Sequence, residues 1–139
     1  VSEILSGKGG DVVTTTPATS ILEVATILAE RKIGALVVMD GDKVCGIVSE
    51  RDLVRHISRD GAEALQHSVA ECMTKSVISC MRSDSVDLVM EKMTAGRFRH
   101  LPVIENGELL GIISIGDVVK RKSEQAMRDA EELKRYIAS

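Results

Sequence analysis

The sequence predicts an α/β (α+β) protein built from two tandem copies of one β-α-β-β-α unit. Two observations carry this prediction. The segment Gly46–Asp52 reads G-I-V-S-E-R-D, and Gly111–Asp117 repeats it as G-I-I-S-I-G-D. At the same offset of 65 residues, Val12–Arg55 and Val77–Lys120 align without gaps and are identical at 10 of 44 positions. Such regular self-similarity indicates an internal duplication, so each element is expected twice.

Each copy opens with a short β-branched stretch, Val12–Thr15 or Val77–Ser79, which predicts a strand. A helix should follow, with Ser20 or Ser85 as its N-cap. Apolar residues at spacings of three and four predict the buried face of these two helices. They are Ile21, Val24, Ala25, Ile27 and Leu28 in the first copy, and Val86, Val89, Met90 and Met93 in the second.

A β-hairpin comes next in each copy. In the first, the turn Asp40-Gly41-Asp42 joins Ala35–Met39 to Val44–Val48. In the second, the turn Glu105-Asn106-Gly107 joins Leu101–Ile104 to Leu109–Ile113. A second helix then begins at each Ser-x-x-Asp. These patterns predict a first repeat over residues 1–60, a linker over 61–68, a second repeat over 69–122 and a C-terminal helical extension over 123–139.

Composition excludes several function classes. A net charge of −3, a single Phe, a single Tyr and no Trp argue against nucleic-acid binding. No apolar run reaches the roughly 18 residues that a membrane span needs. The start of the chain shows no secretory signal, and the three cysteines form no C-x-x-C pair. We therefore expect a cytoplasmic protein with no membrane partner.

The repeated Ser-x-x-Asp has two interpretations. A serine at a strand end, where a helix starts, lies beside unpaired N–H groups that favour phosphate. An aspartate one turn further on can accept hydrogen bonds from a ribose diol. Together they describe a nucleotide site at Ser49 and Asp52 and another at Ser114 and Asp117. The alternative is that each pair only forms a capping box.

The duplicated layout, ending each time in G-h-h-[ST]-x-x-D (h, a hydrophobic residue), resembles a tandem pair of CBS domains, known as a Bateman module. The strand His100–Val103 carries the h-P-V pattern of that family, and Ala70–Thr74 resembles its helical lead-in. Glu50–Val54 and Gly96–Val103 are similar to stand-alone bacterial CBS-pair proteins. The resemblance implies two repeats packed about a pseudo-two-fold axis, with ligand clefts between them.

It also implies a non-enzymatic sensor that binds an adenine nucleotide of the AMP, ATP or NADH class and signals to an unidentified effector protein. The candidate ligand-binding residues share a place in or near the repeated motifs. They are Ser114, Asp117, Ile112, Ile78, Arg99, His100, Pro102, Arg97, Ser49, Asp52, Arg51, Val13, Ile33 and Ala35. Val37 replaces the family proline in the first copy, so the second-copy cleft is expected to be the better binder.

No catalytic machinery is recognisable. His56, His67 and His100 are scattered without a zinc-binding spacing, so neither a catalytic cofactor nor a metal is expected. The rival interpretation is a structural dimerisation module with degenerate sites. An apolar stripe at Ala126, Ala130, Leu133 and Ile137 either packs on its own domain or on a partner subunit, and the resemblance implies a homodimer.

Overall fold

The computed structural model describes residues 1–8 and 12–138. The first half contains α1 (Ser2–Lys8), β1 (Thr14–Thr15), α2 (Ile21–Arg31), β2 (Ala35–Asp40), β3 (Lys43–Ser49) and α3 (Glu50–Asp60). Two 3₁₀ helices follow, η1 (Gly61–Gln66) and η2 (Val69–Glu71). The second half contains α4 (Val86–Gly96), β4 (His100–Glu105), β5 (Glu108–Ser114) and α5 (Ile115–Ala138). The predicted mixed fold with two repeats is confirmed.

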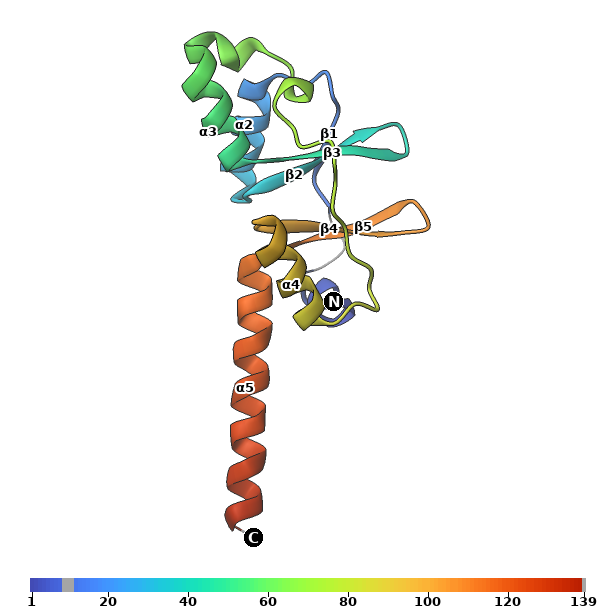
Figure 1. The fold of residues 1–139 in the computed structure, drawn as a ribbon, viewed down its shortest axis with the longest axis vertical. Helices are drawn as coiled ribbons and strands as arrows, with labels where there is room; N and C mark the ends of the chain where they lie inside the picture. The colour runs from blue at the N-terminus through green and yellow to red at the C-terminus, as the bar shows by residue number, and fades with distance from the viewer. Residues whose placement is uncertain (9–11, 139) are drawn as a thin grey trace.

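The two antiparallel hairpins have the same register and lie one above the other in Figure 1. Ala35 pairs with Ser49 in β2–β3, and His100 pairs with Ser114 in β4–β5, so each motif serine ends the second strand of its hairpin. Both ladders also shift register after the valine at the centre of the first strand, Val38 or Val103. The duplication is therefore preserved in detail at the strand ends that carry the Ser-x-x-Asp.

The first strand of each unit differs between the copies. β1 pairs in parallel with β2, Thr14 opposite Val37. The strand expected over Val77–Ser79 is wrong, since the second copy forms only an isolated bridge between Cys80 and Val103. The reason lies at the position of Val37, which is Pro102 in the second copy. A proline has no N–H to donate to a neighbouring strand, so the parallel ladder shortens to one bridge.

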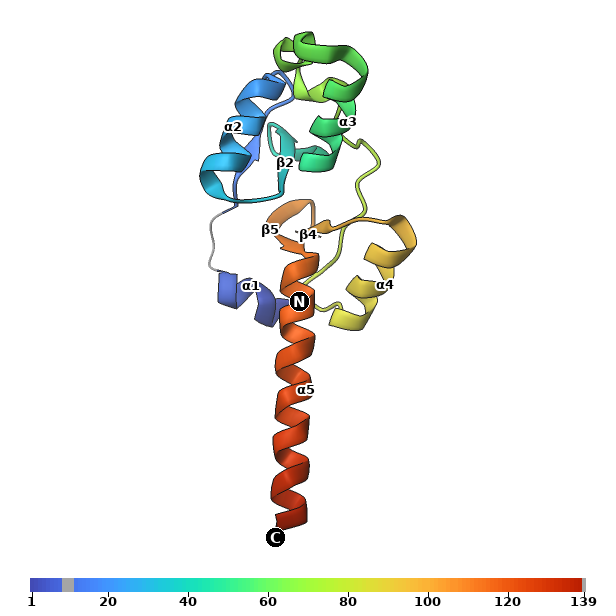
Figure 2. The same ribbon diagram turned by 90° about the vertical axis from the view of Figure 1, so that its left-hand side faces the viewer.

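The segment before each repeat packs on the other repeat. Ile4 of α1 lies in the hydrophobic core that α4, β4, β5 and α5 form in the second repeat. Val69 of η2 lies in the core of the first repeat, against α2, β2, β3 and α3. Figure 2 shows α1 beside α5 and away from α2 and α3 of the first repeat. This exchange binds the two units into one body.

The expected linker is ordered structure. Residues 61–66 form η1, which packs against α2 and α3 and buries Ala64 completely. His67 accepts a hydrogen bond from the Ile21 N–H at its carbonyl, 2.9 Å away. The segment between the repeats therefore belongs to the packed body of the first one.

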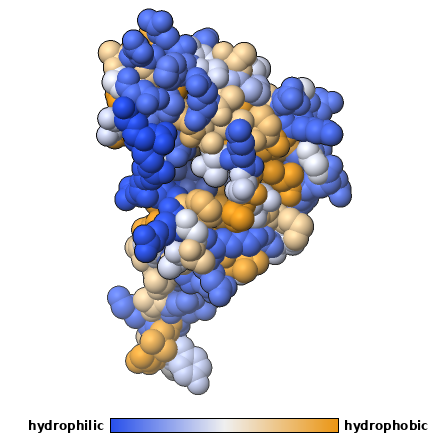
Figure 3. Space-filling view, turned by 45° about the horizontal axis from the view of Figure 1, so that its top comes forward, coloured by the Kyte–Doolittle hydropathy of each residue, from blue (hydrophilic) through white to orange (hydrophobic). Residues whose placement is uncertain are grey.

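α5 extends well beyond the second repeat (Figures 1 and 2). Its 24 residues span about 36 Å at the rise of an α-helix. The apolar stripe Ala126, Ala130, Leu133 and Ile137 is exposed, with Leu133 at 59% and Ile137 at 75%. Figure 3 shows hydrophobic residues at this projecting end among hydrophilic ones. The option that the stripe packs on its own domain is wrong.

Candidate functional site

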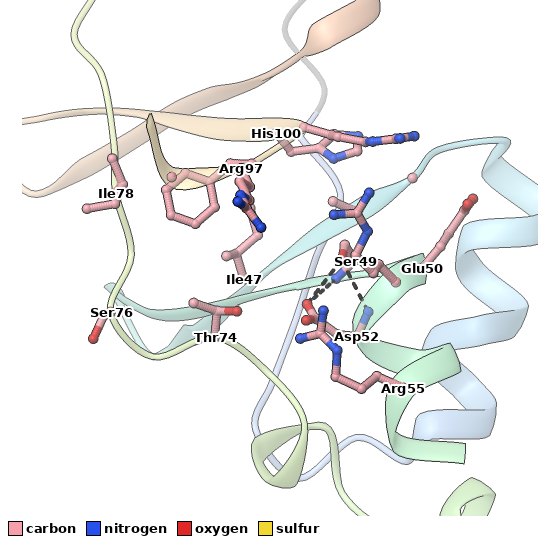
Figure 4. A pocket seen from close by; sticks show the side chains of 16 residues that line it. Ile47, Ser49, Glu50, Asp52, Arg55, Thr74, Ser76, Ile78, Arg97 and His100 are labelled. Carbon is pink, nitrogen blue, oxygen red and sulfur yellow. Dashed lines mark hydrogen bonds between the residues drawn. The ribbon is translucent and has the colours of Figure 1, made fainter. Parts of the chain in front are cut away.

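The two repeats enclose a cavity of about 460 Å³. One wall is the first-copy motif, where β3 passes into α3; the other is the turn between α4 and β4 in the second copy (Figure 4). Its lining includes eight of the predicted ligand-binding residues: Ala35, Ser49, Arg51, Asp52, Ile78, Arg97, Arg99 and His100. Positions far apart in the sequence are thus brought together across the repeat boundary.

Ser49 and Asp52 form a complete capping box at the start of α3. The Ser49 N–H donates to Asp52 Oδ2 at 2.9 Å, and the Asp52 N–H donates to Ser49 Oγ at 3.3 Å. The Ser49 hydroxyl also donates to Asp52 Oδ2, at 3.1 Å. The capping interpretation is therefore right for this pair, and it does not exclude the other. Both side chains line the cavity while they cap the helix.

The charge of the cavity is mainly positive. Arg51 and Arg55 come from the first two turns of α3, and Arg97 and Arg99 come from the turn before β4. Among the described residues of this lining, only Glu50 and Asp52 carry a carboxylate. Guanidinium groups pair with phosphate oxygens in a two-pronged geometry, so this set suits an anionic ligand.

Arg97 reaches the cavity because of its backbone. It follows the last turn of α4 with φ 57°, in the left-handed region, and its N–H donates to the Met93 carbonyl. Lys32 takes the same conformation after α2. In Figure 4, Arg97 and His100 lie across the pocket from Ser49, Asp52 and Arg55. His100 packs closely against Gly34 of the first copy, because a Cβ on Gly34 would stand 2.9 Å from the His100 ring.

Two further lining residues, Thr74 and Ser76, come from the segment that also carries Ile78 and crosses from the first repeat to the second. Thr74 forms two backbone hydrogen bonds with Ile47, of 2.8 and 3.0 Å, and Ser76 and Ile78 continue along the pocket (Figure 4). The sequence pattern did not identify Thr74, Ser76 and Ile47 as site residues. Ile47 was detectable because it matches the predicted Ile112 at the repeat offset. Thr74 and Ser76 carry no such signal, since their place depends on the crossing.

The remaining predicted residues lie outside this cavity. Ser114 and Asp117 form the second capping box, with bonds of 2.8 and 3.1 Å between their N–H groups and side-chain oxygens. Val13 and Ile33 pack against the first hydrophobic core, where plain packing accounts for them. Pro102 is buried in β4 and Ile112 is half-buried in β5. At the repeat offset, Thr74–Ser76 correspond to residues 9–11, which lie outside the described residues.

The surroundings of the half-buried Cys72 and the buried Cys80 make both thiols poorly reactive. Burial raises the pKa of the Cys72 thiol to about 11, with Asp52 and Glu71 adding to the effect. Burial likewise raises the pKa of Cys80 to about 11. A thiol that stays protonated is a weak nucleophile, so neither of these two cysteines is suited to nucleophilic chemistry near neutral pH.

The expectation that the histidines are scattered is wrong for two of them. His56 and His67 are in direct contact, with Nε2 of one 3.0 Å from Nδ1 of the other. Their 11-residue separation matches no common ligand spacing, and the turn from α3 into η1 closes it. His100 lies apart, in the cavity lining.

Comparison with known protein families matches the CBS domain twice, over residues 1–59 and 69–124. Among curated proteins, the chain is 29% identical to the mitochondrial CBS domain-containing protein CBSX3 of Arabidopsis thaliana, over 99% of the chain and 71% of that protein. It is 30% identical to Arabidopsis CBSCBSPB1 over 90% of the chain, but spans only 23% of that longer protein.

Solved structures show the same fold. A CBS-domain protein of Agrobacterium tumefaciens is 54% identical with a TM-score of 0.85, over 88% of this chain and 98% of that one. A CBS domain protein of Pyrobaculum aerophilum complexed with AMP is 32% identical, TM-score 0.74, over 84% and 87%. The CBS domain pair of protein MJ0100, in complex with 5′-methylthioadenosine and S-adenosyl-L-methionine, is 25% identical, TM-score 0.80, over 90% and 96%.

Among the described residues, no helix has the length and hydropathy needed to cross a membrane.

Proposed function

Because the chain belongs to the CBS domain family and carries two such domains in tandem, we propose that it is a non-enzymatic sensor of adenine nucleotides. The ligand occupies the cavity between the first-copy motif and the turn before β4. The observation that carries this proposal is the composition of that cavity, in which four arginines and a Ser-x-x-Asp pair converge from both repeats. The AMP complex of the Pyrobaculum relative supports the ligand class.

Each part of an adenine nucleotide has a counterpart in the lining. Asp52 uses Oδ2 in both of its contacts with Ser49, and its other oxygen, Oδ1, makes neither. A carboxylate placed in this way accepts hydrogen bonds from ribose hydroxyls. Ile47 and Ile78 offer apolar surface to the base, and the arginines offer charge to the phosphates. We therefore infer a preference for AMP, ADP or ATP over uncharged adenosine and over S-adenosyl-L-methionine.

Ligand binding at this place acts on the whole protein because its walls belong to different repeats. A ligand that contacts both walls favours the conformation in which they are close, and an effector protein that distinguishes the conformations receives the signal. The cytoplasmic location and the homodimer remain predictions. The dimer would use the exposed stripe on α5.

Calorimetry with AMP, ATP, adenosine and S-adenosyl-L-methionine tests the proposal. Asp52→Asn and Arg97→Gln should each weaken AMP binding by about tenfold or more, since a charged hydrogen bond contributes about 1.5–3 kcal/mol. Asp117→Asn is the matched control, because it removes the charge from the equivalent capping box. Unchanged AMP affinity in Asp52→Asn refutes the assignment to this cavity. If only Asp117→Asn loses affinity, the second-copy cleft is the better binder, as the sequence predicts.

The structural-module alternative makes the opposite prediction. It requires that no adenine nucleotide bind and that none shift the melting temperature of the wild-type protein. An enzymatic alternative requires product formation from ATP by the purified protein.

A further inference from the structure

A cluster of two imidazoles and a carboxylate lies at the C-terminal end of α3. His56 is on α3 and only 4% exposed, Asp60 is the last residue of α3, and His67 follows η1. His56 Nε2 is 3.0 Å from His67 Nδ1 and 3.4 Å from Asp60 Oδ2, and the last two atoms are 3.8 Å apart. Three donor atoms from separate turns of the chain thus face one point.

Hydrogen bonds within the cluster cannot satisfy all three of its polar atoms at once. A neutral imidazole carries one N–H, so a proton on His56 Nε2 serves either the His67 ring or the Asp60 carboxylate well, but not both. The two rings meet at 76° with centroids 5.2 Å apart, an edge-on contact rather than a stack. Their nitrogens therefore point at each other and at the same carboxylate oxygen.

A metal ion would satisfy all three atoms together. Zn²⁺ binds histidine nitrogen at about 2.0–2.1 Å and carboxylate oxygen at about 2.0–2.2 Å, usually as a tetrahedron. The edges of such a tetrahedron are about 3.3–3.5 Å long for these bond lengths. The observed separations of 3.0, 3.4 and 3.8 Å bracket that value, so small side-chain rotations suffice. We propose that His56, Asp60 and His67 form a binding site for Zn²⁺ or a similar divalent transition-metal ion.

The surroundings are suited to this ion class. Glu71 Oε2 lies 3.9 Å from His67 Nδ1 on an exposed side chain, so its carboxylate adds negative charge beside the site. With Asp60 it brings two negative charges. Arg59 Nη2 lies 3.5 Å from His56 Nδ1, the ring nitrogen that carries the proton when Nε2 binds a metal ion, so the exposed Arg59 side chain must turn away on metal binding. Mg²⁺ and Ca²⁺ take oxygen ligands, whereas a site with two imidazoles favours Zn²⁺, Ni²⁺ or Cu²⁺.

The position of the site relates it to the nucleotide cavity. α3 begins at the Ser49–Asp52 capping box and ends at Asp60. The segment from His67 runs through η2 to Thr74, on the adjoining wall of the cavity. A metal ion would fasten these two segments together behind the cavity, in the region around α3 at the top of Figure 1.

Competition with a chromogenic chelator measures the Zn²⁺ affinity of the metal-free full chain. The wild type should bind one Zn²⁺ per chain, and His67→Gln and Asp60→Asn should each lose at least about tenfold in affinity, since even outer-shell changes cost 10- to 100-fold. His100→Gln is the matched control, because it removes one imidazole elsewhere and should keep wild-type affinity. Thermal unfolding without metal verifies that each variant is folded. Should His67→Gln be destabilised, Asp60→Asn decides, since its side chain is 43% exposed.

Co²⁺ binding separates this site from the cysteines. A histidine and carboxylate site gives ligand-field absorption bands, whereas cysteine ligation adds an intense thiolate-to-metal charge-transfer band. Stoichiometric Co²⁺ binding without that band supports the proposal. The proposal is overturned if the wild type binds no stoichiometric Zn²⁺, if the charge-transfer band appears, or if the deciding variant binds as tightly as the wild type.

Discussion

Gly111→Ala tests the exchange of the lead-in segments between the repeats. A Cβ at Gly111 would stand 2.6 Å from Leu5 Cδ2, about 1 Å closer than a favourable carbon–carbon contact. Overpacking of this kind costs about 1–3 kcal/mol, and the lower backbone entropy of alanine returns up to about 1 kcal/mol. Because Leu5 Cδ2 ends a half-buried side chain that can shift, we expect a net destabilisation of about 1 kcal/mol in equilibrium unfolding with urea.

The source of that cost is checked by a second substitution. Leu5→Ala removes the atom that the new methyl group meets, so the double variant should be more stable than the sum of the single effects predicts, by about 1 kcal/mol or more. Gly7→Ala is the control, because no atom lies within 4 Å of its Cβ position. Additivity of Gly111→Ala and Leu5→Ala within about 0.5 kcal/mol would refute the packing of α1 on the second repeat.

Three further predictions concern charge, thiol reactivity and assembly. Hydrogen bonds from Arg82 lower the pKa of Glu105. Their contribution to stability is therefore present above the ordinary glutamate pKa and is lost as pH falls through the lowered value. Melting temperatures measured between about pH 7 and 3 should fall less steeply for Glu105→Gln than for the wild type. Burial raises the pKa of Cys72 to about 11. Iodoacetamide at about pH 8 should therefore alkylate Cys72 far more slowly in the native protein than in urea. Equal rates of alkylation would contradict its burial. Leu133→Ser with Ile137→Ser should convert a dimer into a monomer by light scattering, and a mass independent of these residues would exclude the α5 stripe as the interface.

The local patterns of the chain were sufficient for the repeat, the hairpins and the capping boxes. Each depends on residues close in sequence: an apolar run, a turn with glycine, a serine three residues before an aspartate. The duplication adds a constraint, since a pattern that appears twice at one offset seldom arises by chance. For this reason the amino-acid sequence is sufficient to select Ser49 and Asp52 as candidate site residues, and both line the cavity.

The sequence contained part of the evidence that the second copy lacks its first strand. Pro102 differs from Val37 at the equivalent position, but the effect of that difference was expected at the cleft. In the structure the proline acts on the pairing of the first strand, because the group it lacks is a backbone N–H directed at that strand.

Only the tertiary structure decided which distant segments meet. Thr74 reaches the cavity, and Leu5 covers Gly111, because each lead-in crosses to the opposite repeat. His56 and His67 meet because η1 folds back on α3. Periodicity reports how a segment buries its own face, whereas these contacts depend on packing between segments that share no pattern. The sequence alone thus determined the two units and their motifs, and the way the units cross determined the cavity and the histidine cluster.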